Sequence, residues 1–336
     1  VSRAGRVTGA RLALPDGEVL VRAARGVVLA SGGFPHDPQR LADWAAAAGG
    51  ADHASAAPRD NTGDGLRLAE AVGAAADAGL AWTTAMAPVS LVPQKDGPPA
   101  HFPHLVERAK PGIIAVTPRG QRFVSEADSY HGFMQALIAA TPPGQKPRCW
   151  LIADHKAQRR WGLGWAKPFP FPLGRALRSG YLKRGRTIAD LARACAIPAA
   201  TLEATIARFN QGAVQGRDPD FHRGESAYNR VQGDAAHGPN PSLAPLTRGP
   251  FYAVQIVPGS LGTFAGLQTD PAARVLTQGG APIPGLFAVG ADMASIMGGH
   301  YPAGGITLGP GMTFGHIAGL VLAGQPVAGL TERKDT

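Results

Sequence analysis

Cysteine is scarce in this sequence, which excludes two ways of stabilising a small domain. The 336 residues contain two cysteines, Cys149 and Cys195. Two thiols so far apart in sequence form neither a disulfide framework nor the ligand spacing of a zinc site. We therefore expect no metal site and a reducing, cytoplasmic setting.

Long apolar runs are absent, and acidic residues are outnumbered by basic ones. No stretch is apolar over the roughly 18 residues that suggest a membrane-spanning helix, so we expect no stable membrane insertion. Lys and Arg number 33 against 24 Asp and Glu, a net charge of +9. The densest basic segment, 155–186, includes aromatic residues, but Pro168 and Pro172 interrupt any long helix there. We expect a solvated surface or attraction of an anionic substrate, and no nucleic-acid binding.

Apolar residues and glycine, by contrast, are abundant. Apolar residues make up 44% of the chain, which suffices for a sizeable core, and the 45 glycines and 30 prolines follow no repeating period. This composition favours a loop-rich α/β protein that holds a ligand. The chain opens at Val1 without a Met, so we expect further residues upstream.

The first part of the chain has strand and turn patterns. Residues 6–14 and 18–23 alternate as two strands joined by a turn at 15–17. The apolar run 26–34 ends in Gly-Gly, which predicts a buried strand followed by a tight turn. Helical spacing extends over 62–80, where Thr62 or Asp64 is suited to be the N-cap.

The middle of the chain differs in texture. Residues 90–250 are rich in proline and basic side chains, with helical segments near 131–140, 188–196 and 199–214. Asp190, Pro198 and Thr201 mark predicted helix starts. Strand and turn patterns return from residue 251. The sequence thus predicts a first domain made of 1–89 and 251–330, with an α+β substrate or cap domain, 90–250, inserted in it.

A glycine-dense segment near the end carries the strongest chemical signal. A buried strand ends at Gly290, and Asp292 follows, placed to accept hydrogen bonds from ribose or ribityl hydroxyls. Residues 298–315 then allow the backbone to approach a flat ligand closely. A helix expected from about Ile306 would direct free N–H groups and a positive dipole end at that ligand.

Five blocks, in this order, resemble FAD-dependent dehydrogenases of the family that contains fumarate reductase flavoproteins and 3-ketosteroid Δ1-dehydrogenases. The blocks are GVVLASGGF (26–34), TGDGLRLAEAVGA (62–74), RGQRFVSEADSY (119–130), GTFAGLQTDPAARVL (262–276) and IPGLFAVGAD with its glycine-rich sequel (283–319). The resemblance implies a Rossmann-like FAD-binding domain. That domain is incomplete at its N-terminus, because no Gly-x-Gly-x-x-Gly pyrophosphate motif is found.

FAD is therefore the expected cofactor. The residues expected to contact it are Ser31, Gly32, Gly33, Gly63, Asp64, Gly65, Gly290, Asp292, Gly304, Thr307 and Leu308.

The glycine-rich loop resembles the steroid side of the family more than the fumarate side. Fumarate reductases have roughly His-Gly-x-Asn-Arg-x-Gly-Gly there, but Gly298 stands at the His place and Pro302 at the Arg place. Tyr301-Pro302 with Gly305 matches the steroid pattern, and Tyr130 follows the Arg-Phe-x-x-Glu block. The resemblance implies that Tyr301 and the Gly305 N–H polarise a carbonyl and that Tyr130 is the general base.

These roles imply a small-molecule substrate, a hydrophobic ketone dehydrogenated at the neighbouring CH–CH bond, and an external electron acceptor. Two alternatives stay open: an enoate reductase of the fumarate type, and a truncated or non-catalytic remnant of such a flavoprotein. Structural interpretations also stay open for individual residues. Arg122 and Glu126 have the i, i+4 spacing of an ion pair, and His131 and His300 are either acid–base groups or structural.

Overall fold

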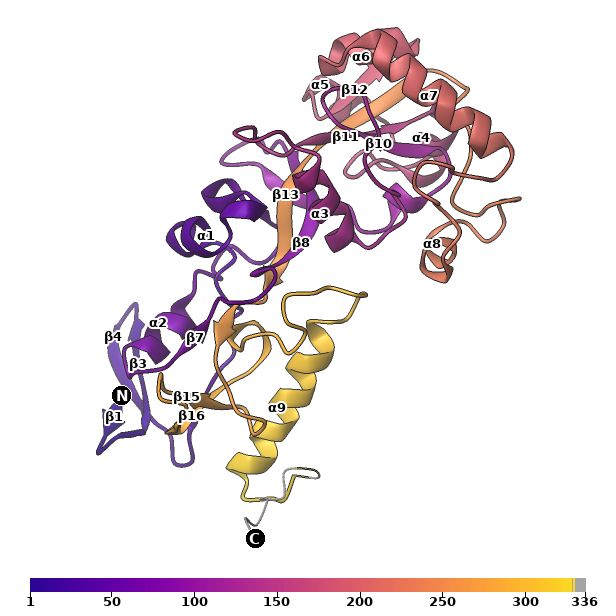
Figure 1. Ribbon diagram of the computed structural model, residues 1–336. Coiled ribbons are helices and arrows are strands. Elements are labelled where there is room, and N and C mark those ends of the chain that lie inside the picture. Colours follow the sequence, from indigo (N-terminus) through magenta and orange to yellow (C-terminus); the bar gives the residue numbers. More distant parts are fainter. Residues whose placement is uncertain (328, 330–336) are drawn as a thin grey trace. The chain divides into compact units, whose positions relative to one another are not determined.

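Residues 1–327 and 329 are described by a computed structural model, in which the chain forms two compact units (Figure 1). The first comprises Val1–Ala46, Ala57–Ala85 and the chain from Gly262, and the second comprises Ala47–Ala56 and Met86–Leu261. The expected boundaries after 89 and 250 thus compare with 85 and 261 in the structure. The second boundary lies later than expected because one continuous strand, β13, covers Phe251–Thr263. Leu330, the expected end of the first domain, lies outside the described residues.

The first unit contains short strands and three helices, and the α/β prediction is confirmed. Its elements are β1 (Ser2–Arg3), β2 (Arg6–Val7), β3 (Gly9–Leu14), β4 (Gly17–Arg22), β5 (Val27–Leu29), α1 (Pro38–Trp44), α2 (Asp64–Glu70), β7 (Ala76–Asp77), β14 (Gly266–Leu267), β15 (Arg274–Leu276), β16 (Pro282–Ala288) and α9 (Leu308–Leu322).

A three-stranded sheet in the order β15-β16-β5 organises this unit. Strand β16 pairs in parallel with β5 and antiparallel with β15. Helix α9 packs its Ala318 against Phe287 and Val289 at the end of β16, and α9 runs beside β15 and β16 in Figure 1. The predicted hairpin is confirmed as β3 and β4, paired antiparallel from Gly9–Arg22 to Leu14–Gly17.

The helix predicted over 62–80 is wrong in its second half. Helix α2 ends at Glu70, and Gly73 has a φ of +88°. A glycine in this left-handed conformation ends helices because it has no Cβ to clash. The expected N-cap is also wrong: Gly63 is the N-cap, with no side-chain cap.

The second unit is built on one mixed sheet covered by helices. Its elements are β6 (Ala54–Ser55), β8 (Thr84–Val92), β9 (Ala100–Pro103), β10 (Ile113–Val116), α3 (Tyr130–Ala139), β11 (Cys149–Ala153), α4 (His155–Trp161), α5 (Gly174–Arg178), β12 (Leu182–Gly185), α6 (Ile188–Cys195), α7 (Ala199–Val214), α8 (Ala227–Gln232) and β13. Short 3-10 turns connect several elements of both units, such as Glu107–Ala109 and Gly290–Asp292.

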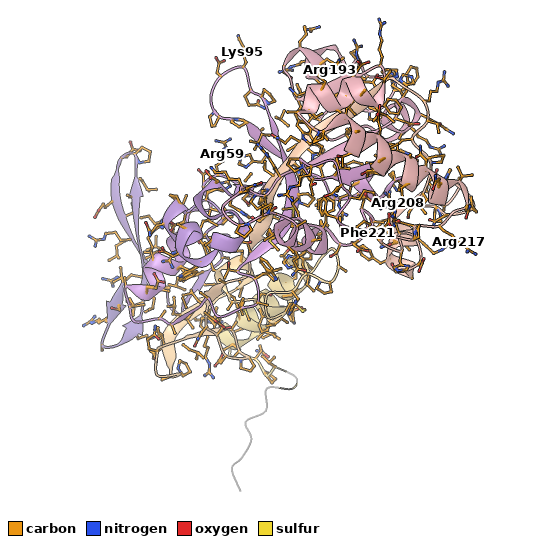
Figure 2. All side chains as sticks on the ribbon, turned by 45° about the horizontal axis from the view of Figure 1, so that its top comes forward. Arg59, Lys95, Arg193, Arg208, Arg217 and Phe221 are labelled. Atoms are coloured by element: carbon orange, nitrogen blue, oxygen red, sulfur yellow. The ribbon has the colours of Figure 1, made fainter. Side chains whose placement is uncertain are left out.

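Strand β13 is central to this sheet, whose order is β10-β11-β13-β8-β9, with β12 and β6 also paired to β13. Helices α6 and α7 cover β10, β11 and β13, and buried Ile114, Ile152 and Leu202 belong to the shared core. The opposite sides of the two helices carry exposed arginines, among them Arg193 and Arg208 (Figure 2). The predicted helices near 131–140, 188–196 and 199–214 are confirmed as α3, α6 and α7.

The start of α6 uses local side-chain capping, as the sequence predicts in part. Thr187 accepts a hydrogen bond from the Asp190 N–H, and the Asp190 carboxylate accepts one from the Thr187 N–H. Asp190 is therefore the third helical residue of a capping box rather than the first. Pro198 is the N-cap of α7, whereas Thr201 lies inside that helix.

A buried network of charges lies at the centre of the second unit. The fully buried Glu126 carboxylate accepts hydrogen bonds from Arg122 at 2.8 and 2.7 Å and from Arg223 at 2.9 Å. Arg122 also binds Asp218 at 2.9 and 2.8 Å. Phe209 and Phe221 lie under the Arg122 guanidinium, with ring centroids at 4.8 and 5.0 Å. The pairing of Arg122 with Glu126 is thus confirmed as structural, and its other partners are far away in sequence.

These contacts fix the charge state of Glu126. Burial by itself raises the pKa of this carboxyl, but the charges of Arg122 and Arg223 outweigh it and hold the pKa at about 2, below the ordinary 4.5. The folded state therefore favours the carboxylate. Its contribution to stability is present above pH 4.5 and is lost as the pH falls toward 2.

We predict that Glu126→Gln destabilises the protein by about 3–5 kcal/mol at pH 7, because the buried Arg223 guanidinium loses its carboxylate partner and Arg122 keeps only Asp218. Denaturant unfolding measures this change, with the exposed Glu203→Gln as the matched control. The variant is also expected to lose less stability than the parent between pH 4.5 and 2. Equal stability of the two variants at pH 7 contradicts the structural role.

Candidate functional site: a glycine-lined acid turn and helix start

The predicted glycine-rich loop leads directly into α9. Gly298, Gly299 and Gly305 have φ values of +61°, +84° and +90°, which other residues rarely adopt. A side chain built on Gly304 or Gly305 would meet no atom within 4 Å, so space lies beside this backbone. At Gly299 a Cβ would instead lie 2.5 Å from the Trp82 backbone nitrogen. The first half of the loop is therefore packed, and the second half is open.

Helix α9 begins where this open backbone ends. Thr307 is its N-cap and makes no side-chain cap bond, and the helix starts at Leu308, two residues after the predicted Ile306. The Leu308 and Met312 side chains are 69% and 74% exposed. Within the first turn the Gly309 N–H donates to the Gly305 carbonyl at 2.8 Å and Pro310 has no N–H. The helix start therefore directs its positive dipole end and the Leu308 N–H toward a ligand. Exposed apolar side chains beside it suit the face of a flat ring.

Tyr301 lies in the same loop, and its side chain is buried. It is 5% exposed, and its ring centroid is 5.6 Å from that of Phe264 at an interplanar angle of 50°. The fixed part of the loop, 298–299, packs on residues 81–82, where Ala81 donates to the Gly298 carbonyl at 3.3 Å. The Tyr301 ring is thus held by packing four residues before Gly305.

A second group of predicted residues converges on one buried carboxylate. Asp292 has no exposed surface. It accepts hydrogen bonds from the Ser31 backbone N–H, from the Ser31 hydroxyl at 3.0 Å and from the Gly33 N–H at 3.1 Å. The Ser31 hydroxyl in turn accepts from the Gly65 N–H at 3.1 Å. We name this group of Ser31, Gly33, Gly65 and Asp292 the acid turn.

The glycines of the acid turn are required by close packing. A Cβ on Gly65 would lie 2.8 Å from the Asp292 carboxyl, and one on Gly33 would lie 2.1 Å from the Thr263 hydroxyl. Gly32 is in a left-handed conformation beside Asn61, where a Cβ would be 2.4 Å from the side-chain amide. Such contacts leave no room for a side chain, so only glycine fits these positions.

The remaining predicted residues are placed less uniformly. Gly63 donates to the Gly33 carbonyl at 2.9 Å and so adjoins the acid turn. Gly290 lies beside α9, because a Cβ on Gly311 would be 3.5 Å from the Gly290 Cα. Asp64 is exposed and pairs with Arg67. The predicted cofactor residues of the first unit thus lie either in or beside the acid turn or near the start of α9. Asp64 is the exception, since its side chain pairs with Arg67 of the same helix.

A narrow cavity of about 40 Å³ separates the turn at 290–296 from the start of α9. Its lining includes Gly290, Ala291, Ile306, Thr307 and Pro310. A cavity of this size has room for about one water molecule and does not itself receive a flavin ring. The open backbone of Gly304 and Gly305 is the part of this region that leaves space for a flat ligand. No Gly-x-Gly-x-x-Gly motif for a pyrophosphate occurs within these 336 residues.

Tyr130 belongs to the second unit and begins α3. Ser129 caps this helix by accepting from the Gly132 N–H at 3.0 Å. Tyr130 and His131 are 7% and 3% exposed. Arg108, also buried, lies over the Phe133 ring of the same helix at 5.3 Å.

A chain of buried polar groups in the second unit was not predicted from the sequence. The Ser90 hydroxyl lies 2.7 Å from both the Tyr181 hydroxyl and His104 Nε2. The other ring nitrogen of His104, Nδ1, lies 2.6 Å from Glu107 Oε1. Ser90, His104 and Tyr181 come from separated segments, so no local spacing could indicate the network.

The protonation of this network follows from its contacts. Burial raises the pKa of Tyr181 to about 12, so its hydroxyl keeps its proton at neutral pH. Burial by itself raises the pKa of Glu107, but the adjacent His104 lowers it below its ordinary value. We interpret the network as a structural connection between β8, β9 and β12.

Neither metal nor thiol chemistry is indicated by the described residues. Among residues 1–327 and 329, no three His, Cys, Asp or Glu side chains could together hold a metal ion. Cys149 and Cys195 are free and buried, and burial raises the pKa of both thiols, that of Cys195 to about 12. None of the described helices has the length and apolar character needed to cross a bilayer.

The comparisons with known proteins agree with this geometry. Residues 1–308 match the model of a family described as FAD binding domain, and the chain belongs to that family. FAD is accordingly the cofactor that the family binds, as predicted from the sequence. The mixed α/β fold with this domain is likewise confirmed.

The individual relatives include ketosteroid dehydrogenases and dehydrogenases of smaller ring ketones. The chain is 42% identical over 318 residues to 4-oxocyclohex-2-ene-1-carboxylate 5-dehydrogenase of Sinomonas cyclohexanicum, with 94% of this chain and 53% of that protein covered. It is 39% identical over 312 residues to 3-oxosteroid 1-dehydrogenase of Mycobacterium tuberculosis, covering 91% of this chain and 54% of that protein. The chain thus spans about half the length of these relatives.

A solved structure gives the same result. The 3-ketosteroid Δ1-dehydrogenase of Sterolibacterium denitrificans, in complex with 1,4-androstadiene-3,17-dione, matches with a TM-score of 0.85 and 35% identity, covering 95% of this chain and 57% of that one. A probable fumarate reductase of Shewanella frigidimarina is 27% identical over 303 residues, covering 88% of this chain and 44% of that protein. The predicted placement nearer the ketosteroid side is confirmed.

We predict that Asp292→Asn weakens FAD binding at least tenfold, because the amide nitrogen cannot accept the hydrogen bonds that now come from Ser31 and Gly33. Flavin absorbance of the purified protein and fluorescence titration with FAD measure the change. Asp16→Asn, in the exposed turn between β3 and β4, is the matched control. Retention of full FAD content by Asp292→Asn contradicts the importance of the acid turn.

Proposed function

We propose that the protein is an FAD-dependent dehydrogenase that oxidises a CH–CH bond next to a ring ketone. The observation that supports this most is the placement of Tyr301 and Gly305 in one glycine-rich loop at the start of α9. The packed half of the loop holds the phenol, and the open half leaves backbone accessible. An N–H and a phenol on one loop are suited to binding a single carbonyl oxygen.

In the proposed reaction the α-carbon loses a proton, the β-carbon loses a hydride, and a C=C bond forms between them. Negative charge develops on the ketone oxygen as the proton leaves. The Tyr301 hydroxyl and the Gly305 N–H stabilise that charge by hydrogen bonding. Tyr130 takes the proton as general base. FAD, when bound, supplies the hydride acceptor, and an external acceptor then receives the electrons.

The acid turn and the start of α9 have positioning roles in this proposal. The remaining residues expected to contact FAD do so through backbone groups of Gly32, Gly290, Gly304 and Leu308. The Gly63 and Gly65 N–H groups donate to the Gly33 carbonyl and to the Ser31 hydroxyl, so these residues hold the backbone in place. The Thr307 hydroxyl makes no cap bond to α9 and is assigned to the cofactor. Asp292 acts mainly by holding the turn, since Ser31 and Gly33 already occupy its oxygens.

The substrate class is proposed from the relatives and the charge of the chain together. Both the oxocyclohexene carboxylate and the 3-oxosteroid of the related enzymes are ketones of a six-membered ring. The carboxylate-bearing ring is the first choice, because its enzyme is more similar to this chain and because the chain carries a net charge of +9. Positive charge favours the approach of an anionic substrate.

We predict that 4-oxocyclohexanecarboxylate bleaches the flavin of the FAD-loaded protein under anaerobic conditions, faster than 4-androstene-3,17-dione does. Anaerobic absorbance spectroscopy without an added acceptor measures both bleaching rates, and reduction of a dye in a separate assay measures turnover. Fumarate, offered to the dye-reduced protein, tests the reductase alternative, for which Pro302 in place of Arg is unfavourable. A protein that binds FAD but is bleached by no ring ketone refutes the dehydrogenase proposal. Failure to bind FAD at all supports the non-catalytic alternative.

We predict that Tyr301→Phe lowers kcat roughly 10²- to 10³-fold, the usual effect of losing one donor to a developing oxyanion. Tyr130→Phe is expected to lower kcat at least as much and to abolish exchange of the substrate α-proton with deuterated solvent. Tyr252→Phe, a tyrosine of β13 with no proposed role, is the control. Wild-type kcat and exchange in both variants exclude the assigned roles while leaving FAD binding untouched.

A further inference from the structure

One segment of the second unit accounts for the whole net charge of the chain. Residues 155–186 contain nine Lys and Arg and no Asp or Glu. The rest of the chain therefore has 24 basic and 24 acidic residues, since 33 − 9 = 24. Of the nine, Arg160 alone has a carboxylate partner within the described residues, namely Asp234 at 2.8 Å. The positive charge of this segment is thus concentrated and largely uncompensated.

Aromatic rings are exposed within the same segment. Phe169 and Phe171 are 71% and 51% exposed, on a loop that contains Pro168, Pro170 and Pro172. Their rings contact cations: the Arg159 guanidinium lies 5.1 Å from the Phe169 centroid, and the Lys167 ammonium lies 5.0 Å from that of Phe171. The two phenylalanines therefore present apolar surface between positive charges.

The loop is fixed to the unit rather than freely hanging from it. Phe169 donates to the Arg159 carbonyl at 2.8 Å, and the Arg159 guanidinium donates to the Phe171 carbonyl at 3.0 Å. The buried Gln158 amide donates to the carbonyls of Ala166 and Lys167, each at 3.3 Å. These hydrogen bonds to α4 fix the loop with both rings pointing outward. Because the loop is already ordered, little conformational entropy is lost when it binds a partner.

We infer that residues 155–178 form a docking surface for the face of an anionic lipid bilayer. A bilayer interface offers negative headgroups and, a few ångströms deeper, hydrocarbon, so it satisfies the cations and the two phenyl rings together. An acidic protein or a nucleic-acid duplex satisfies the cations but offers the exposed rings of Phe169 and Phe171 less apolar surface than hydrocarbon does. The binding is peripheral and reversible, since two rings and a basic surface do not make a transmembrane anchor.

The test is co-sedimentation of the FAD-loaded protein with vesicles of phosphatidylglycerol and phosphatidylcholine, compared with vesicles of phosphatidylcholine alone. We expect binding to the anionic vesicles that weakens as salt is raised. The double variant Phe169→Ser/Phe171→Ser and the double variant Lys167→Glu/Arg178→Glu are each expected to bind roughly tenfold more weakly or worse. Thermal unfolding checks that all variants are folded.

Matched controls come from the same unit. Val214→Ser replaces an apolar residue that is 69% exposed. Arg217→Glu reverses an exposed charge just after the end of α7, at a residue labelled in Figure 2. Both controls are expected to bind as the parent does. Absence of binding to anionic vesicles overturns the inference. So does unchanged binding by the phenylalanine variant, or equally tight and equally variant-sensitive binding to polyglutamate or duplex DNA.

Discussion

The buried carboxylate of Asp292 is the constraint on which the candidate site depends. It accepts hydrogen bonds from Ser31 and Gly33 after β5, and Ser31 passes the connection to Gly65 at the start of α2. Two chain segments far apart in sequence, around residues 31–33 and at Gly65, are thereby fixed to the turn that precedes α9. A buried carboxylate without such donors is costly, so its hydrogen bonds and its burial require each other.

The same arrangement explains why glycine recurs in the matching blocks. At Gly33 and Gly65 a side chain would collide with Thr263 or with Asp292 itself, whereas at Gly304 and Gly305 it would meet nothing. The first pair is required for packing, and the second pair keeps backbone open to a ligand. Glycine density in the sequence therefore reflects two physical demands, and the structure separates them residue by residue.

Local patterns in the sequence were sufficient for much of the fold. The hairpin of β3 and β4 and the helices α6 and α7 follow from alternation, turn residues and capping. The strand predicted within 26–34 is present as β5, but the expectation that it is buried is wrong, since Val28 is 39% exposed. The sequence failed where the outcome depends on a distant partner or on one backbone angle. Gly73 ends α2 through a left-handed φ, and Asp218 and Arg223 complete the Arg122–Glu126 network from nearly a hundred residues away. Ser31, Gly33 and Asp292 were each expected from the sequence to contact FAD, but the hydrogen bonds that join them to one another could not be predicted.

Geometry and affinity are separate physical contributions to the binding of a cofactor. The acid turn is made of hydrogen bonds and close packing within the first unit, so it is formed before any ligand binds. Preorganised backbone of this kind holds a ligand in a fixed geometry. It also loses little conformational entropy when the ligand binds. A pyrophosphate motif contributes affinity instead, through N–H groups directed at two phosphates. The acid turn belongs to the first kind of arrangement, so its geometry can be measured in this chain independently of any affinity for FAD.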